Sequence, residues 1–183
     1  MADSSITKKA LASSLKELMK EQSFSSISVA NISERCNMNR KSFYYHFKDK
    51  YELVNWIFDT EFISVISSEE NPVGWDIVTK LAEYLYQNHS FYRAAMRIEG
   101  QNSFRDHFHE VVAAMLGHEM KRLFAESEIN EFQLLFLADC FTCAFLRWID
   151  QKNCMSAEEF ILNTRDLIEK LAVQAYRTIE ADK

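Results

Sequence analysis

Cationic, hydroxyl and aromatic side chains are concentrated between Asn39 and Lys50, in the sequence NRKSFYYHFKDK. Arginine and lysine pair with phosphate oxygens, and arginine can donate two hydrogen bonds to the edge of a guanine. Phe43 and Phe47 stand four residues apart, so on a helix both would face a core. The stretch therefore predicts a short helix with one buried face and one face suited to nucleic acid.

A second short helix and a tight turn would hold this stretch in place. Ser28 is a good N-cap for a helix that runs from about Val29 to Cys36. Asn37 follows, and asparagine tolerates the left-handed backbone that such a turn needs. Asn39 can then cap the basic helix, from about Arg40 to His46. Two helices of this size are not stable alone, so neighbouring helices must support them.

The composition of the whole chain also favours helices. Its 183 residues include three Gly and one Pro, with 48% hydrophobic and 26% charged residues. Capping-box spacings at Asp49 and Glu52, at Asn130 and Gln133, and at Ser156 and Glu159 mark further helix starts. Ser67 to Pro72 is the most loop-like segment. We expect an all-α fold of about nine helices, near residues 6–19, 29–36, 40–46, 49–66, 75–88, 90–97, 103–124, 131–151 and 156–179.

Charge is distributed unevenly along the chain. The net charge is −6, yet residues 1–50 carry nine Lys and Arg against five Asp and Glu. The remainder carries 12 against 22. This asymmetry indicates a phosphate-binding surface attached to an acidic body with a different task.

Several classes of protein are not supported by the sequence. The start MADSSITKK lacks the apolar region of a signal peptide, and no run of about 18 apolar residues follows, so we expect a cytoplasmic protein without a membrane segment. Cys36, Cys140, Cys143 and Cys154 sit in helical patterns and are expected to be reduced core thiols. Neither a metal-binding set nor a catalytic set is apparent, and we expect no enzyme activity, metal or cofactor.

The segment ISVANISERCNMNRKSFYYHFKDKYELV resembles the N-terminal signature of the TetR family of bacterial transcription regulators. Where that family commonly has Ala-Gly at the turn, this chain has Cys36-Asn37. The resemblance implies a three-helix, helix-turn-helix DNA-binding domain over residues 1–50. It also implies a helical regulatory and dimerisation bundle over residues 51–183.

Roles at the DNA follow from the same resemblance, position by position. Ser28 and Lys50 would contact phosphates, and Arg40 and Lys41 would face base edges or the backbone. Ser42 would lie against a base or a phosphate, and Tyr44 and Tyr45 would contact phosphate or thymine methyl groups. His46 would support the backbone contact, and Asn39, the helix cap, belongs to the same DNA-binding set.

The resemblance also implies a homodimer that binds a palindromic DNA operator, paired through the two last long helices. The segments KYELVNWIF, NHSFYRAAM, GQNSFRDHF, FLRWID and SAEEF are similar to a subgroup that includes regulators of dihydroxyacetone kinase operons. That subgroup implies activation through a partner resembling a dihydroxyacetone kinase subunit. Most of the wider family are repressors relieved by a small-molecule effector, so the sign of control stays open.

Candidate effector-binding residues are aromatic, basic or acidic positions in the middle helices. They are Trp75, Tyr84, Tyr92, Arg93, His107, His118, Asp139 and Arg147. Asp139 lies within an apolar run, so we expect it to be buried and paired with Arg147, His118 or a ligand.

A function of another class also fits the sequence. An all-helical interaction or ligand-carrier protein could keep the helix-turn-helix without using it. Site-specific, salt-dependent DNA binding separates the two hypotheses.

Overall fold

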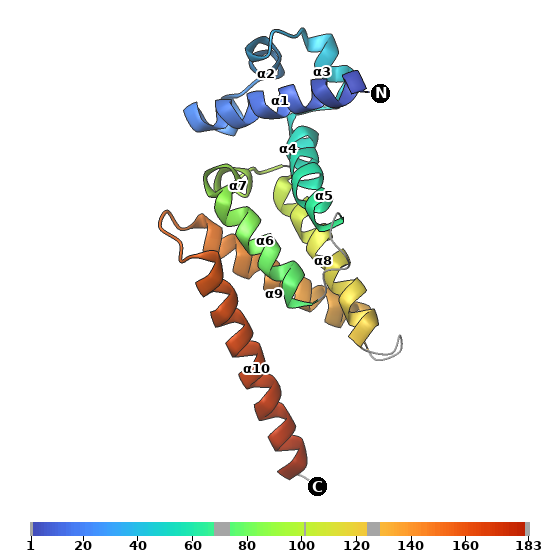
Figure 1. The fold of residues 1–183 in the computed structure, drawn as a ribbon, viewed down its shortest axis with the longest axis vertical. Coiled ribbons are helices and arrows are strands. Elements are labelled where there is room, and N and C mark those ends of the chain that lie inside the picture. The colour runs from blue at the N-terminus through green and yellow to red at the C-terminus, as the bar shows by residue number, and fades with distance from the viewer. Residues whose placement is uncertain (1, 68–73, 101, 124–128, 182–183) are drawn as a thin grey trace.

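Helices make up the regular structure of the chain in the computed structural model, which describes residues 2–67, 74–100, 102–123 and 129–181. No strand occurs within these ranges. The first three α-helices lie at one end of an elongated molecule, and the last helix extends to the opposite end (Figure 1).

The helices follow the predicted order. Where α4, the π-helical turn η2 and α5 are counted as one continuous rod, the described residues form nine helices. A short 3₁₀ turn, η1, adds to them. The bounds are α1 Ala2–Glu21, η1 Phe24–Ser26, α2 Val29–Arg35, α3 Arg40–His46, α4 Lys50–Phe58, η2 Asp59–Ile63, α5 Ser64–Ser67, α6 Trp75–Gln87, α7 His89–Ala95, α8 Phe104–Leu123, α9 Glu131–Asp150 and α10 Ala157–Ala181.

The turn between α2 and α3 has the predicted geometry. Ser28 and Asn31 form a reciprocal capping box at the start of α2. Asn37 adopts a φ of 54°, the left-handed backbone that asparagine tolerates. The Asn39 side chain accepts a hydrogen bond of 2.9 Å from the Ser42 backbone N–H. Local hydrogen bonds therefore set where α3 begins.

Other helix starts were predicted with mixed success. The capping boxes at Asn130 and at Ser156 are present. At α4 the Asp49 carboxylate caps the helix, but Glu52 accepts from the Lys48 backbone N–H rather than from that of Asp49. The helix expected from about residue 90 begins one residue earlier, at His89, and Asn88 precedes it. Most of the loop expected at Ser67 to Pro72 lies outside the described residues.

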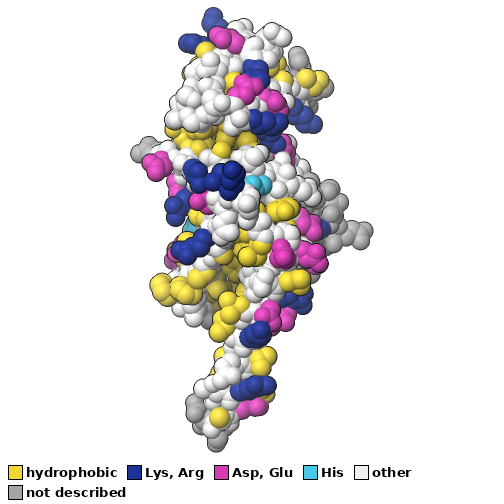
Figure 2. Space-filling view, turned by 90° about the vertical axis from the view of Figure 1, so that its left-hand side faces the viewer, with side chains coloured by type: hydrophobic (Ala, Val, Ile, Leu, Met, Phe, Trp, Pro, Cys, Tyr) yellow, Lys and Arg dark blue, Asp and Glu magenta, His cyan; other side chains and the backbone are white. Residues whose placement is uncertain are grey.

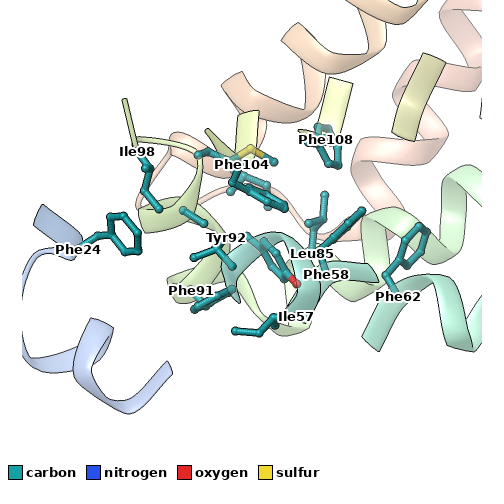
Figure 3. Close-up of a cluster of buried hydrophobic side chains, with 14 of the residues drawn as sticks. Phe24, Ile57, Phe58, Phe62, Leu85, Phe91, Tyr92, Ile98, Phe104 and Phe108 are labelled. Atoms are coloured by element: carbon teal, nitrogen blue, oxygen red, sulfur yellow. The ribbon is translucent and has the colours of Figure 1, made fainter. Parts of the chain in front are cut away.

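Phe58 occupies the centre of an aromatic core. Its ring is buried, and it contacts rings from several helices (Figure 3). Tyr92 of α7 and Phe104 and Phe108 of α8 all pack edge-on, with centroids 5.4–5.9 Å away. Phe62 stacks on Phe58 at 5.2 Å from the next turn of the rod. This cluster joins the rod to α7 and α8.

The π-helical turn carries Glu61, whose carboxylate bonds to two other helices. Glu61 accepts hydrogen bonds from Lys16 of α1 at 2.6 Å and from the Tyr84 hydroxyl of α6 at 2.8 Å. The Tyr84 and Tyr92 hydroxyls lie 2.6 Å apart, and burial raises the pKa of both phenols. A polar chain therefore runs from α1 through the π turn to α6 and α7.

Lys50 fixes the end of the α1–α2 connection. Its ammonium donates hydrogen bonds of 2.7 Å to the carbonyl oxygens of Phe24 and Ile27. It also lies 4.4 Å from the centroid of the Phe24 ring. Desolvation lowers the pKa of this ammonium. Lys50 thus holds η1 against the start of α4.

Apolar side chains remain exposed on α9 and α10. The set comprises Phe132, Leu135, Phe136, Leu162, Leu167, Ile168, Leu171, Val173, Tyr176 and Ile179. Figure 2 shows hydrophobic side chains gathered over the lower half of the molecule, where α10 extends. By length and composition α9 is apolar enough to cross a membrane, although the core helix of a soluble protein passes the same test. It packs on α8, and 28% of its most apolar window is buried.

The thiols depart from expectation. Cys140 and Cys143 are exposed on α9, while Cys36 and Cys154 are half-buried, and all four are free. The expectation of core thiols was wrong for the first two. They lie on the outward face of a helix that is apolar nearly all round, so the apolar sequence pattern did not separate its two faces.

Phe58→Ala is expected to lower the free energy of unfolding by about 3–5 kcal/mol, because it leaves a cavity among the rings of three helices. Urea unfolding at one fixed protein concentration measures this loss. Phe58→Leu retains part of the volume and should cost less. Equal stability of the wild type and Phe58→Ala would show that the ring does not anchor the core.

Lys50→Met keeps the aliphatic stem over Phe24 and removes the ammonium. The lost charge-assisted hydrogen bonds should cost about 1–2 kcal/mol, reduced by partial solvent exposure. Lys48→Met, two residues away and exposed, should change stability by less than about 0.5 kcal/mol. The same urea titration compares both variants, and an undiminished stability of Lys50→Met would contradict this role.

Candidate nucleic-acid interface

α3 separates its buried and exposed side chains as the sequence predicted. Phe43 and Phe47 are buried, and their rings lie 5.8 Å apart. Tyr44 and Tyr45 point outward, with Tyr45 84% exposed. A helix of seven residues is stable here because the two phenylalanines join the main core of the chain.

Two basic side chains stand at the beginning of α3. Arg40 and Lys41 are both exposed and follow directly after the Asn39 cap. The positive end of the helix dipole points the same way, so two side-chain cations and the helix N-terminus favour anions on one surface. The exposed side chains of Arg40 and Lys41 can therefore reach a phosphate or a base edge from solvent.

A shallow groove of about 410 Å³ runs beside these cations. It is lined by Thr7 of α1 and by residues of the turn and α3, namely Met38, Asn39, Lys41, Ser42, Tyr45 and His46. The rings of Tyr45 and His46 meet edge to face at 4.9 Å. The structure thus brings five of the proposed DNA-contacting residues to one groove. The helix α3 lies at one end of the molecule (Figure 1).

Two other proposed contacts are engaged within the protein. The Ser28 hydroxyl donates to Asn31 Oδ1 at 2.6 Å and accepts from the Asn31 backbone N–H at 3.2 Å. Its side chain is nevertheless exposed. Lys50 has turned its ammonium toward the carbonyls of Phe24 and Ile27. The expected phosphate contact of Lys50 is therefore not supported by this geometry.

The candidate effector residues do not converge on one site. Tyr84 and Tyr92 belong to the polar chain around Glu61, and His107 Nε2 lies 2.7 Å from Asp59 Oδ1. Arg93 donates to the Asp150 carbonyl oxygen at 2.8 Å and so ties α7 to the end of α9. Each of these four side chains has a structural partner.

Three of the other four candidates lie on the surface, and the fourth, Trp75, lines a cavity. Arg147 is exposed, and the His118 side chain is 80% exposed. Trp75 lines a cavity between α6, α8, α9 and α10. The expectation for Asp139 was wrong, because its side chain is 70% exposed and lies 2.9 Å from His109 Nε2. It sits on the outward face of α9, where water solvates it.

Sequence reasoning missed Glu119, which is buried beside the cavity that Trp75 lines. A signal was present in the spacing. Val112, Leu116 and Glu119 recur at helical intervals, so Glu119 falls on the apolar stripe of α8. An acid on such a stripe is expected to be buried. Asp139 instead belongs to a helix that is apolar nearly all round, where the apolar pattern does not tell the buried side from the exposed one.

Comparisons with known proteins agree with this arrangement. Residues 13–57 match the family model for bacterial regulatory proteins of the tetR family. Residues 75–170 match a model for the C-terminal region of transcriptional regulators. Both are families of regulators rather than enzymes.

One curated relative is the HTH-type dhaKLM operon transcriptional activator DhaS of Lactococcus lactis, 33% identical over 100 residues. The match spans about half of each chain, 54% of both. It therefore does not extend over the whole of either protein.

Solved structures show the same fold over most of the chain. The dihydroxyacetone kinase operon activator DhaS aligns with a TM-score of 0.67 at 24% identity, over 91% of this chain and 96% of that one. A TetR regulator from Streptococcus agalactiae gives 0.67 at 18% identity, over 88% and 93%. NalD of Pseudomonas aeruginosa, a secondary repressor of a multidrug efflux pump, gives 0.58 at 16% identity, over 88% and 94%.

The second family model alone covers more than half of the chain, and the first covers the two short helices and the turn between them. The chain belongs to the TetR family of bacterial transcriptional regulators.

Proposed function

We propose that this regulator binds a palindromic DNA operator as a homodimer, with α3 in the major groove of each half-site. The observation that carries the proposal is the exposed basic and aromatic face of α3 on its phenylalanine anchors. In helix-turn-helix proteins the second helix reads base edges while the first crosses the backbone. Asn39, Arg40, Lys41, Ser42, Tyr44, Tyr45 and His46 are the residues we place at the DNA, with Ser28 at a flanking phosphate.

A second copy of the chain would cover the exposed apolar faces of α9 and α10. Phe132, Phe136 and Cys143 recur at helical spacing along one side of α9, and all are exposed. Uncovered apolar surface of this extent is unusual on a monomer. Two copies related by a two-fold axis would also present two α3 helices to two half-sites about one helical turn apart.

We also propose a division of labour along the chain. Residues 1–50 would contact DNA, and residues 51–183 would dimerise and receive the signal in the cytoplasm. Lys50 opens α4 and bonds to the carbonyls of Phe24 and Ile27, so the proposed boundary would fall inside a packed joint rather than a free linker.

The regulated genes are proposed from the curated relative. That protein is named as an activator of the dhaKLM operon. By similarity, this chain would activate genes for dihydroxyacetone use, through a kinase-like coactivator protein or a small-molecule effector. DNase footprinting of the DNA upstream of its own operon tests this, with and without dihydroxyacetone and the neighbouring gene products. A promoter–reporter fusion gives the sign of control, and lower expression in the presence of the protein would identify a repressor instead.

Arg40→Ala is expected to change which operator bases are preferred, because arginine is the side chain best suited to a bidentate guanine contact. Gel shift against a panel of single-base operator variants measures the preference. A uniform loss of affinity over the panel would assign Arg40 to a phosphate rather than to a base.

Lys41→Ala should weaken binding to all sequences and lower the slope of log affinity against log salt by about 1. Lys152→Ala removes the same charge from the exposed connection after α9 and is the matched control, with no change expected. If Lys41→Ala and Arg40→Ala both left DNA binding unchanged, the interface assigned to α3 would be wrong. A wild type without site-specific, salt-dependent DNA binding would instead be an interaction or ligand-carrier protein.

Phe136→Glu places a carboxylate on the exposed apolar face of α9, where desolvation against a partner would disfavour it. We expect the wild type to sediment as a dimer at micromolar concentration and Phe136→Glu as a monomer. Asn163→Glu adds the same charge to the polar face of α10 and should leave the dimer intact. A monomeric wild type would contradict the proposed assembly.

A further inference from the structure

A cleft of about 630 Å³ lies where the helix-turn-helix part of the chain meets the helical body. Its lining comes from η1 and the start of α4 on the first part, and from α7 and the connection after α9 on the second. It shares no residue with the apolar cavity that Trp75 lines. Pockets that bind small molecules usually have volumes of about 300–1,000 Å³. The cleft is therefore large enough for a small ligand that would contact both parts of the protein.

The charge of the cleft is opposite to that of the body. Residues 51–183 carry 12 Lys and Arg against 22 Asp and Glu. Arg93, Arg97 and Lys152 nevertheless line the cleft, and Glu99 is the one acid among its described lining residues. Figure 2 shows Lys and Arg side chains gathered beside a histidine at the height of α7. Cations that line a concave surface attract anions to it.

The two arginines are each anchored through one nitrogen. Arg93 Nε donates to the Asp150 carbonyl oxygen at 2.8 Å, and Arg97 Nε donates to Asp150 Oδ1 at 2.6 Å. No hydrogen bond within the described residues involves an Nη atom of either side chain. Asp150 offsets the charge of Arg97 but leaves these Nη donors available. Both guanidinium groups are thus oriented in advance, which lowers the entropy that they lose on binding an anion.

Hydroxyl groups contribute to the lining from both parts of the protein. Ser23 and Ser25 belong to the η1 side, Tyr51 belongs to α4, and Ser90 belongs to α7. Among the described residues, the hydroxyls of Tyr51 and Ser90 have no hydrogen-bond partner. A hydroxyl both donates and accepts, so this lining suits a ligand that carries several hydroxyls of its own.

We propose that this cleft binds a small sugar phosphate: Arg93 and Arg97 hold the phosphate through their Nη atoms, and the lining hydroxyls contact the sugar. A phosphate monoester carries a charge of about −1.5 to −2 at neutral pH and three acceptor oxygens, so two guanidinium groups can bond to it at once. A carboxylate carries one charge and two oxygens, and it would engage the pair less completely. An acidic segment of a protein partner supplies only carboxylates, so the arginine pair favours the sugar phosphate.

The site lies outside the helical bundle and offers the small-molecule branch of the proposed regulation a second point of action. A ligand there would contact η1, which precedes α2, and α7 of the body, and would restrain their relative movement. Only this regulatory consequence rests on the proposed function. Binding is measured on DNA-free protein, so a failure of operator recognition would not affect its outcome.

Isothermal titration at low ionic strength tests the site with three ligands that share one carbon skeleton: glucose 6-phosphate, glucuronate and glucose. We expect glucose 6-phosphate to bind at least about tenfold more tightly than glucuronate, and glucose to bind most weakly. Glucuronate that bound as tightly as glucose 6-phosphate would overturn the proposal and indicate a surface for acidic protein segments. An absence of measurable glucose 6-phosphate binding at about 1 mM would also overturn it.

Inorganic phosphate tests the role of the hydroxyl lining in the same titration. It should bind less tightly than glucose 6-phosphate, because it carries no sugar hydroxyls to bond to the serines and Tyr51. Equal affinity of the two ligands would overturn the sugar contact.

Arg97→Gln removes one guanidinium group and should weaken glucose 6-phosphate about tenfold. Arg165→Gln on α10 is the matched control, because it breaks an exposed pair of similar geometry, with Nε 2.7 Å from Glu169 Oε1, outside the cleft. We expect no change in that variant, and thermal unfolding verifies that both proteins are folded. Unchanged binding by Arg97→Gln would contradict the assigned phosphate contact.

Glu99→Gln removes the acid from the lining and should strengthen glucose 6-phosphate binding about twofold to fivefold, because the phosphate loses a like charge nearby. A distorted site would lose affinity, so a gain separates the charge effect from structural damage. Glu110→Gln, exposed on α8 and outside the lining, is the control and should change nothing. Equal or weaker binding by Glu99→Gln would show that the phosphate does not occupy this cleft.

Discussion

The packing of Phe58 against the rings around it joins the parts of this molecule. The ring lies near the end of α4, and the helices that contact it, α7 and α8, belong to the C-terminal part of the chain. The first turns of α4 pack on α1 and are tied to η1 through Lys50. One continuous rod therefore connects the α3 surface to the body, and a shift of either end must be absorbed within this rod or at its contacts.

The π-helical turn is the place where the rod departs from regular geometry. It directs Asp59 toward His107 of α8 and Glu61 toward Lys16 of α1 and Tyr84 of α6. Such turns occur mostly as single insertions within α-helices and are frequent at functional sites. Here the turn holds contacts to both parts of the protein within five residues.

The buried and half-buried polar side chains of the helical body differ in how completely they are hydrogen-bonded. Tyr92 is buried and Tyr84 is half-buried, and their phenols form a hydrogen-bonded chain that ends at a carboxylate. Glu119 is buried as well, and within the described part of the chain only one of its two oxygens has a hydrogen-bond donor. The Tyr84–Tyr92 chain thus joins polar groups of different helices, whereas Glu119 bonds to Arg122 of its own helix.

The sequence alone determined the helix order, the helix caps at Ser28 and Asn39, the left-handed Asn37 and the burial of Phe43 and Phe47. These features depend on residues within one or two helical turns of each other, so local spacing contains the information. Only the tertiary structure decided where Lys50, Asp139 and Glu119 lie. Lys50 bonds to carbonyls more than 20 residues away. Asp139 and Glu119 both interrupt apolar helices, but only Glu119 is buried. The side of α9 that carries Asp139 faces outward, whereas neighbouring helices enclose Glu119 on α8. That enclosure depends on contacts between helices that are distant in the sequence. The periodicity of a single helix does not reveal those contacts.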